Sequence, residues 1–242
     1  MPLVKKYRNG RSHHLLMPNF AAFLKLKYMY FKDGVNFYSP MEERINVWSH
    51  GLGIVMSVVG LLLLVQRAVS TGDVWRIVSF SIFGVSMILL YTASTVYHHS
   101  KTPKVRVRLN IFDHSSIYVL IAGSYTPFTL VTLHGWVGWT VFGISWGAAL
   151  AGIILKFFFI GRHKMLSTIM YILMGWIIVI AVKPLINNLS SEGLIWLLAG
   201  GISYTVGAVL YSLKGMKFNH AVFHIFVLAG TICHFVAVYW FV

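Results

Sequence analysis

Histidines stand at the ends of two long apolar runs, and their spacing is suited to binding a metal ion. The segment 91–100, YTASTVYHHS, ends one run with His98 and His99, and the last run opens with FNHAVFHIFVLAG. His220 and His224 are four residues apart, so a helix would present both imidazoles on one face. With His98 they would form a three-histidine set, which leaves zinc a fourth position for water.

A carboxylate and a hydroxyl near these histidines add the groups that a hydrolase needs. Asp113 is the only carboxylate within the apolar runs, and an ionisable group inside a bilayer is costly and commonly functional. Beside a metal-activated water it could accept a proton. Ser94, one turn before His98, could donate a hydrogen bond to a developing oxyanion. Imidazole ligands suit zinc, copper, iron or nickel, and we favour Zn²⁺ because it needs no redox partner.

Further polar residues lie near the ends of the apolar runs, on the same predicted side of the membrane. Glu43, Asn46 and His50 follow one another at helical spacing in EERINVWSH, where they could orient the histidine ligands or simply pack at the end of the bundle. His99 points about 100° away from His98 on a helix and is the alternative ligand from that run.

Each candidate residue also has a simpler explanation when it is taken alone. His220 and His224 could be histidines that prefer the lipid headgroups. Asp113 could pair with a basic residue of the preceding segment SKTPKVRVRLN, and Ser94 could be a helix-packing serine. We favour the hydrolytic site because all these residues lie near the ends of three predicted helices that reach the same leaflet of the membrane.

The composition is that of an integral membrane protein. Of 242 residues, 57% are hydrophobic and 11% are charged, whereas soluble domains carry about 25% charged residues. The Lys and Arg residues that give the net charge of +14 lie mostly outside the apolar runs and on one side of the predicted membrane. This distribution favours membrane topology and does not indicate a nucleic-acid partner. A single cysteine, Cys233, excludes an intrachain disulfide and a cysteine-based metal site.

Apolar runs predict an all-α fold, a bundle of seven transmembrane helices over residues 45–242. Their expected ranges are 45–66, 77–98, 114–134, 135–155, 165–182, 193–213 and 218–242. Seventeen of the twenty Lys and Arg residues fall on the side of the N-terminus, which predicts a cytoplasmic N-terminus and an external C-terminus. Residues 1–44 form a basic cytoplasmic segment in which 19–31 is either an interfacial helix or part of a tail.

Four motifs together resemble the hemolysin III family: EERINVWSHGLG, STVYHHS, FDHSSIYVLIAGSYTPF and HAVFHIFVLAG. That family is the bacterial branch of the progestin and adipoQ receptor proteins, in a superfamily that includes alkaline ceramidases. The resemblance covers about residues 42–242 and implies a zinc ion near the cytoplasmic leaflet. By motif it assigns the site to Ser94, His98, Asp113, His220 and His224. In relatives such a site is linked to hydrolysis of sphingolipid amides.

The sequence therefore supports a zinc-dependent hydrolase of the bacterial inner membrane that acts on an amide or ester bond of a lipid. One alternative is a non-catalytic sensor of membrane fluidity or homeostasis with structural zinc. Another is a lytic protein, as the family name suggests, although the runs contain no charged conduction path. The oligomeric state is left open by the sequence.

Overall fold

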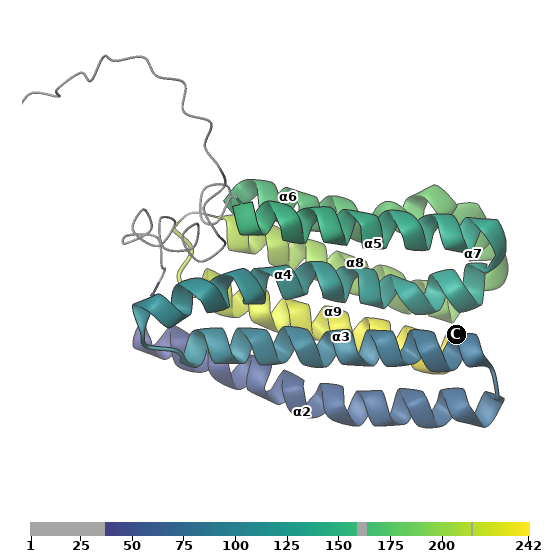
Figure 1. The fold of residues 1–242 in the computed structure, drawn as a ribbon, viewed down its shortest axis with the longest axis horizontal. Helices are drawn as coiled ribbons and strands as arrows, with labels where there is room; N and C mark the ends of the chain where they lie inside the picture. Colours follow the sequence, from purple (N-terminus) through teal and green to yellow (C-terminus); the bar gives the residue numbers. More distant parts are fainter. Residues whose placement is uncertain (1–36, 159–163, 214) are drawn as a thin grey trace, which may run out of the picture. The chain divides into compact units, whose positions relative to one another are not determined.

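The computed structural model describes residues 37–158, 164–213 and 215–242, and it forms no β-strand in them. Seven helical spans in these residues are long and apolar enough to cross a membrane, so the predicted all-α, seven-helix fold is confirmed (Figure 1). The elements are α2 (Pro40–Thr71), α3 (Val74–His99), α4 (Pro103–Pro127), the π-helical η1 (Phe128–Leu133), α5 (Gly135–Phe158), α6 (Lys164–Gly175), the 3₁₀ helix η2 (Ile177–Ala181), α7 (Val182–Asn188), α8 (Ser191–Ser212) and α9 (Asn219–Phe241). The basic segment predicted for 1–44, with its interfacial helix, lies outside the described residues up to position 36.

Local capping explains where the first two helices begin and end. α2 starts with Pro40 in its first turn, and the Ser39 hydroxyl accepts a hydrogen bond from the Glu42 backbone N–H at 3.2 Å. It ends at Gly72, whose φ of 69° lies in the left-handed region that glycine adopts without strain. Asp73 then caps α3 by accepting from the Trp75 backbone N–H at 2.8 Å. This short connection makes α2 and α3 antiparallel neighbours.

The third span begins much earlier than the sequence predicted. Instead of starting near residue 114, α4 starts at Pro103, where the Arg106 backbone N–H bonds to the Thr102 carbonyl at 2.9 Å. The prediction was wrong because the basic residues of this segment suggested a loop. Thr102 and Pro103 are instead a helix start, with proline in the first turn. Asp113 consequently lies about three turns inside α4 and not in its first turn. In the apolar part of this span 83% of residues are buried, which makes α4 the central helix.

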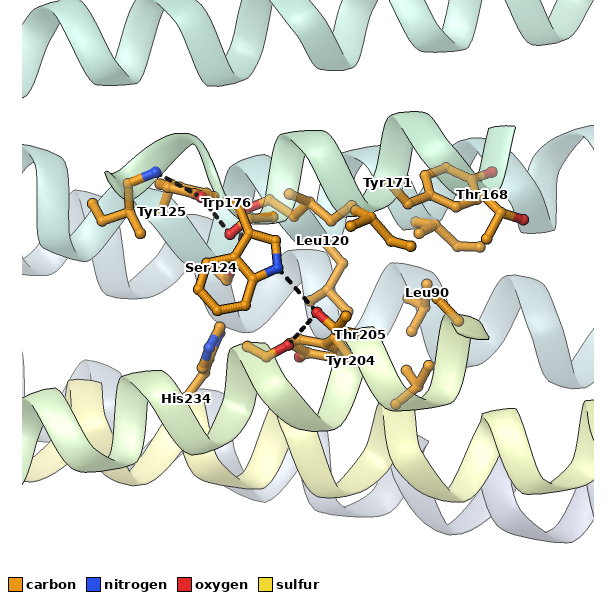
Figure 2. Close-up of a pocket in the computed structure, with 18 of the residues that line it drawn as sticks. Leu90, Leu120, Ser124, Tyr125, Thr168, Tyr171, Trp176, Tyr204, Thr205 and His234 are labelled. Atoms are coloured by element: carbon orange, nitrogen blue, oxygen red, sulfur yellow. Dashed lines mark hydrogen bonds between the residues drawn. The ribbon is translucent and has the colours of Figure 1, made fainter. Parts of the chain in front are cut away.

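The fifth span is broken where one continuous helix over 165–182 was predicted. Pro184 cannot donate a backbone hydrogen bond, and its ring crowds the carbonyl four residues earlier. The buried Tyr125 hydroxyl lies 2.7 Å from the Gly175 carbonyl oxygen and accepts from the Ile178 backbone N–H at 3.1 Å (Figure 2). The side chain of α4 thus replaces backbone hydrogen bonds that the broken helix loses.

The directions of the helices bring one set of helix ends together. α2, α4, α6 and α9 begin, and α3, α5 and α8 end, at the same end of the bundle, whereas the C-terminus lies at the other end (Figure 1). This arrangement brings the last turn of α3 beside the first turns of α9. The side of the membrane that this end faces is still a prediction from the basic residues.

We predict that Tyr125→Phe destabilises the bundle by about 1–3 kcal/mol, because the Gly175 carbonyl and the Ile178 N–H would lose their buried partner. Thermal unfolding of the purified protein in detergent measures this loss. Thr140→Ala is the control, since the exposed Thr140 hydroxyl bonds only to the Trp136 carbonyl of its own helix. An unfolding midpoint that does not change in Tyr125→Phe would contradict this role for the hydroxyl.

Candidate metal centre

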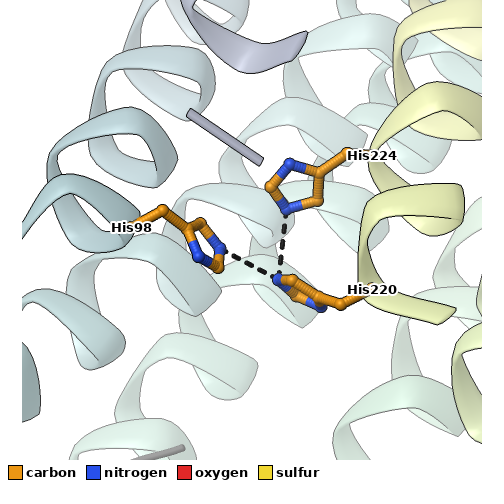
Figure 3. Close-up of side chains that lie close together, drawn as sticks. All are labelled: His98, His220 and His224. Atoms are coloured by element: carbon orange, nitrogen blue, oxygen red, sulfur yellow. Dashed lines mark hydrogen bonds between the residues drawn. The ribbon is translucent and has the colours of Figure 1, made fainter. Parts of the chain in front are cut away.

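Three buried histidines converge where α3 meets α9. His98 comes from the last turn of α3, and His220 and His224 come from successive turns of α9, with 3%, 4% and 2% of their surfaces exposed. Nε2 of His220 lies 2.9 Å from Nε2 of His98 and 3.1 Å from Nε2 of His224. Figure 3 shows the three rings pointing at one another from the two helices. The structure therefore brings together the three imidazoles that the sequence predicted as metal ligands.

Protons alone cannot satisfy this cluster. If Nε2 of His220 donates its hydrogen to His98, it has no lone pair left for His224, and if it carries no hydrogen it has only one lone pair for two neighbours. At least one of the two close nitrogen contacts is therefore unfavourable in every protonation state. A divalent cation between the rings would accept all three lone pairs, and these nitrogen ligands fit a first-row metal such as zinc.

The far side of the His98 ring is fixed by α2. Oε2 of Glu43 lies 2.7 Å from Nδ1 of His98, and Nδ2 of Asn46 lies 3.3 Å from the same nitrogen. The carboxylate can only accept here, so Nδ1 donates the hydrogen and Nε2 keeps its lone pair for the centre of the site. Nδ2 of Asn46 is itself a donor, so its contact with this N–H is not a hydrogen bond. Such carboxylate–histidine pairs commonly orient metal ligands.

A buried arginine holds the glutamate in turn. Arg106 of α4 is 1% exposed and forms an ion pair with Glu43. Its guanidinium also donates to the Ser100 carbonyl at 3.0 Å and lies 4.5 Å from the centre of the Tyr97 ring. α4 is thereby tied both to α2 and to the end of α3 that carries His98.

Aromatic and imidazole rings pack against the two histidines of α9. The Tyr38 ring stacks on His220 at 4.6 Å between centroids, and the His50 ring stacks on His224 at 3.6 Å. Neither ring nitrogen of His50 has a hydrogen-bond partner among the described residues. His50 therefore touches the site by ring contact and does not orient a ligand by hydrogen bonding, which was one of the roles considered for it.

Asp113 and Ser94 line an apolar cavity beside the histidines, whereas His99 faces away from the site. Asp113 is 6% exposed, and its Oδ2 lies 3.4 Å from Nδ1 of the adjacent His114. Ser94 is 1% exposed, and its hydroxyl has no partner among the described residues. His99 is exposed, so α3 turns its alternative ligand out of the bundle.

An elongated, mainly apolar cavity of about 370 Å³ extends from the metal centre into the bundle. Ser94, Asp113, His220 and His224 line it at the histidine end. Tyr171 and Thr168 lie toward one end of the view in Figure 2, and Tyr125, Trp176 and His234 lie toward the other. Cavities of this size and apolarity, with few polar groups, are typical of small-molecule sites.

Arg106 and Tyr38 are the residues of this site that sequence reasoning missed. Arg106 was assigned to a loop, although its position seven residues before Asp113 places both on one face of a continuous helix. Had the Thr-Pro start of α4 been recognised, a buried arginine would have been expected on the face that carries Asp113. No sequence signal identified Tyr38, because its contact with His220 depends on tertiary packing.

Comparisons with known proteins find relatives over most of the chain. The family model described as haemolysin-III related matches residues 38–235. The chain is 47% identical to Hemolysin-3 of Bacillus cereus, over 83% of this chain and 92% of that protein. It is 48% identical to the Hemolysin-3 homolog of Bacillus subtilis (strain 168), over 83% and 94%. It is 28% identical to the Homo sapiens Monocyte to macrophage differentiation factor, over 84% and 86%.

The family match and the seven apolar helices make this chain a multi-pass membrane protein. The matched region includes every residue of the histidine cluster and of the lining of the cavity beside it. The resemblance drawn from the four motifs is confirmed: the chain belongs to the haemolysin-III related family.

Proposed function

We propose that this protein is a zinc-dependent hydrolase that cleaves an amide or ester bond of a membrane lipid. The observation that carries the proposal is a cluster of three buried imidazoles, two of which line one apolar cavity together with a carboxylate and a hydroxyl. A purely structural metal site would need neither Asp113 nor an unpartnered Ser94 hydroxyl beside it.

In this proposal His98, His220 and His224 hold the zinc ion, and three protein ligands leave one position open. Zinc held there would polarise the scissile carbonyl and activate a water molecule. Glu43 keeps the His98 ring in the tautomer that offers Nε2 to the metal. The tight packing of Tyr38 and His50 on the other two rings limits their rotation.

Two side chains would handle the proton and the developing charge. Asp113 accepts a proton from the attacking water and returns it to the leaving amine or alcohol. Ser94 donates its unpartnered hydroxyl to the oxyanion that forms on the carbonyl oxygen. Both residues line the cavity, so a substrate that enters it can reach them.

The substrate class follows from the cavity walls. Residues such as Leu90, Ile117 and Leu120 continue the lining away from the histidines and suit a hydrocarbon chain. We place the protein in the bacterial plasma membrane with the metal centre toward the cytoplasm, because most basic residues lie at that end of the helices.

Purified wild-type protein in detergent should contain about one zinc ion per chain. The double variant His220→Ala, His224→Ala should lose it, because a single imidazole cannot retain the ion. Elemental analysis by mass spectrometry measures the metal content. His99→Ala is the matched control, since this neighbouring histidine is exposed, and full zinc content in the double variant would refute the assignment.

Replacing Glu43 by glutamine should weaken zinc binding by about 10–100-fold, because the charged acceptor that orients His98 is lost. Competition with a chromogenic chelator gives the affinity. Glu192→Gln, an exposed glutamate in the first turn of α8, should leave the affinity unchanged. Equal affinities for the wild type and Glu43→Gln would mean that Glu43 does not orient a ligand.

Asp113→Asn should retain zinc and fold but lower turnover by about 10²–10⁴-fold, because the proton acceptor is removed. Lipid profiles would be compared for cells that express the wild type, Asp113→Asn or the control Asp73→Asn, a half-buried helix cap outside the cavity lining. The substrate would be a lipid that only the Asp113 variant leaves intact. If Asp113→Asn keeps both zinc and cellular function, the non-catalytic sensor with structural zinc is the better explanation.

A further inference from the structure

His234 is a buried ionisable residue that takes no part in the metal centre. It lies on α9 ten residues after His224, which is about 15 Å farther along the helix. Only 8% of its surface is exposed, and it lies well inside a membrane-crossing helix. Such residues are costly in a bilayer and usually mark a binding site or pathway.

One hydrogen bond fixes the hydrogen on this ring. Nε2 of His234 lies 3.2 Å from the Leu197 carbonyl oxygen, which can only accept. Nε2 therefore donates, and in the neutral ring Nδ1 is left as an acceptor with a free lone pair. Nδ1 has no hydrogen-bond partner among the described residues.

The surroundings hold the ring in place without satisfying this acceptor. α8 approaches so closely that a Cβ added to Gly200 would lie 2.1 Å from the ring Cδ2. The Tyr204 ring meets the imidazole edge-on at 5.2 Å, but its hydroxyl is hydrogen-bonded to Thr231 at 2.9 Å. Thr231 in turn accepts from Tyr91 at 2.8 Å, so these neighbouring hydroxyls are already engaged with one another.

His234 also lines the cavity that begins at the metal centre. Among the described lining residues, four have a buried polar atom without a partner: His50, Ser94, His220 and His234. The first three are gathered around the histidine cluster. His234 stands apart from them, toward the same end of the view as Tyr125 and Trp176 in Figure 2 and away from Thr168 and Tyr171.

We propose that His234 is a second recognition point, at which Nδ1 accepts a hydrogen bond from a hydroxyl group on the hydrocarbon chain of the bound lipid. This inference rests on the proposed function, because it requires the cavity to hold a lipid chain. An extended chain advances about 1.3 Å per carbon, since its C–C bonds are about 1.5 Å long. With the head group beside His224, the roughly 15 Å to His234 corresponds to about 12 carbons, so a hydroxyl near carbon 12 would reach His234.

The test uses fatty acids as probes, because their binding requires no turnover. Full-length protein in detergent micelles is equilibrated with tritiated octadecanoic acid, which is then displaced by the 12-hydroxy or the 6-hydroxy isomer of hydroxyoctadecanoic acid. The isomers share composition and head group and differ only in where the hydroxyl lies. The wild type should bind the 12-hydroxy isomer about fivefold more tightly, as one net hydrogen bond allows.

His234→Leu should keep binding octadecanoic acid but lose the preference between the isomers. Gly200→Ala should reduce the preference by displacing the ring. Gly143→Ala on α5, outside the cavity lining and with nothing within 4 Å of its added Cβ, should retain it. Equal binding of both isomers by the wild type, or an unchanged preference in His234→Leu, would overturn the inference and leave the hydrolase proposal standing. Failure of the wild type to bind octadecanoic acid at all would overturn the lipid cavity, and with it both proposals.

Discussion

The constraint on which the rest of this bundle depends is a buried cluster of three imidazoles, in which Nε2 of His220 lies 2.9 and 3.1 Å from the Nε2 atoms of the other two. No arrangement of protons satisfies all three, and unsatisfied polar groups are most costly where water is excluded. The helices nevertheless hold the rings in this position through contacts from several directions. In the proposed function, this arrangement presents three lone pairs to one cation, which would remove the conflict between the rings.

The support for that scaffold comes from outside the two helices that carry the histidines. Glu43 reaches His98 from α2, and Arg106 reaches Glu43 from α4, so three helices share one buried network of charge and hydrogen bonds. Buried ion pairs contribute little net stability, but breaking one partner is strongly destabilising. The network therefore serves mainly to fix positions, and it joins the central helix α4, with Asp113 on it, to the metal centre.

Much of the site could be predicted from the sequence because its signals are local. The four-residue spacing of His220 and His224, and the uncharged runs, required only helical periodicity and the thickness of a bilayer. The burial of Arg106 and the hydrogen bonds of Tyr125 to the broken helix could not be predicted in the same way. Arg106 looks solvent-exposed until its partner Glu43 is placed beside it, and the broken helix depends on a tyrosine about fifty residues earlier in the chain. Tertiary pairing decided both.

X-ray absorption spectroscopy at the zinc edge, on the purified wild-type protein, tests the central claim most directly. Coordination by three imidazoles predicts a first shell of nitrogen or oxygen at about 2.0–2.1 Å and outer-shell scattering from the histidine rings. A spectrum without zinc, or one whose first shell shows a single imidazole or none, would contradict the account.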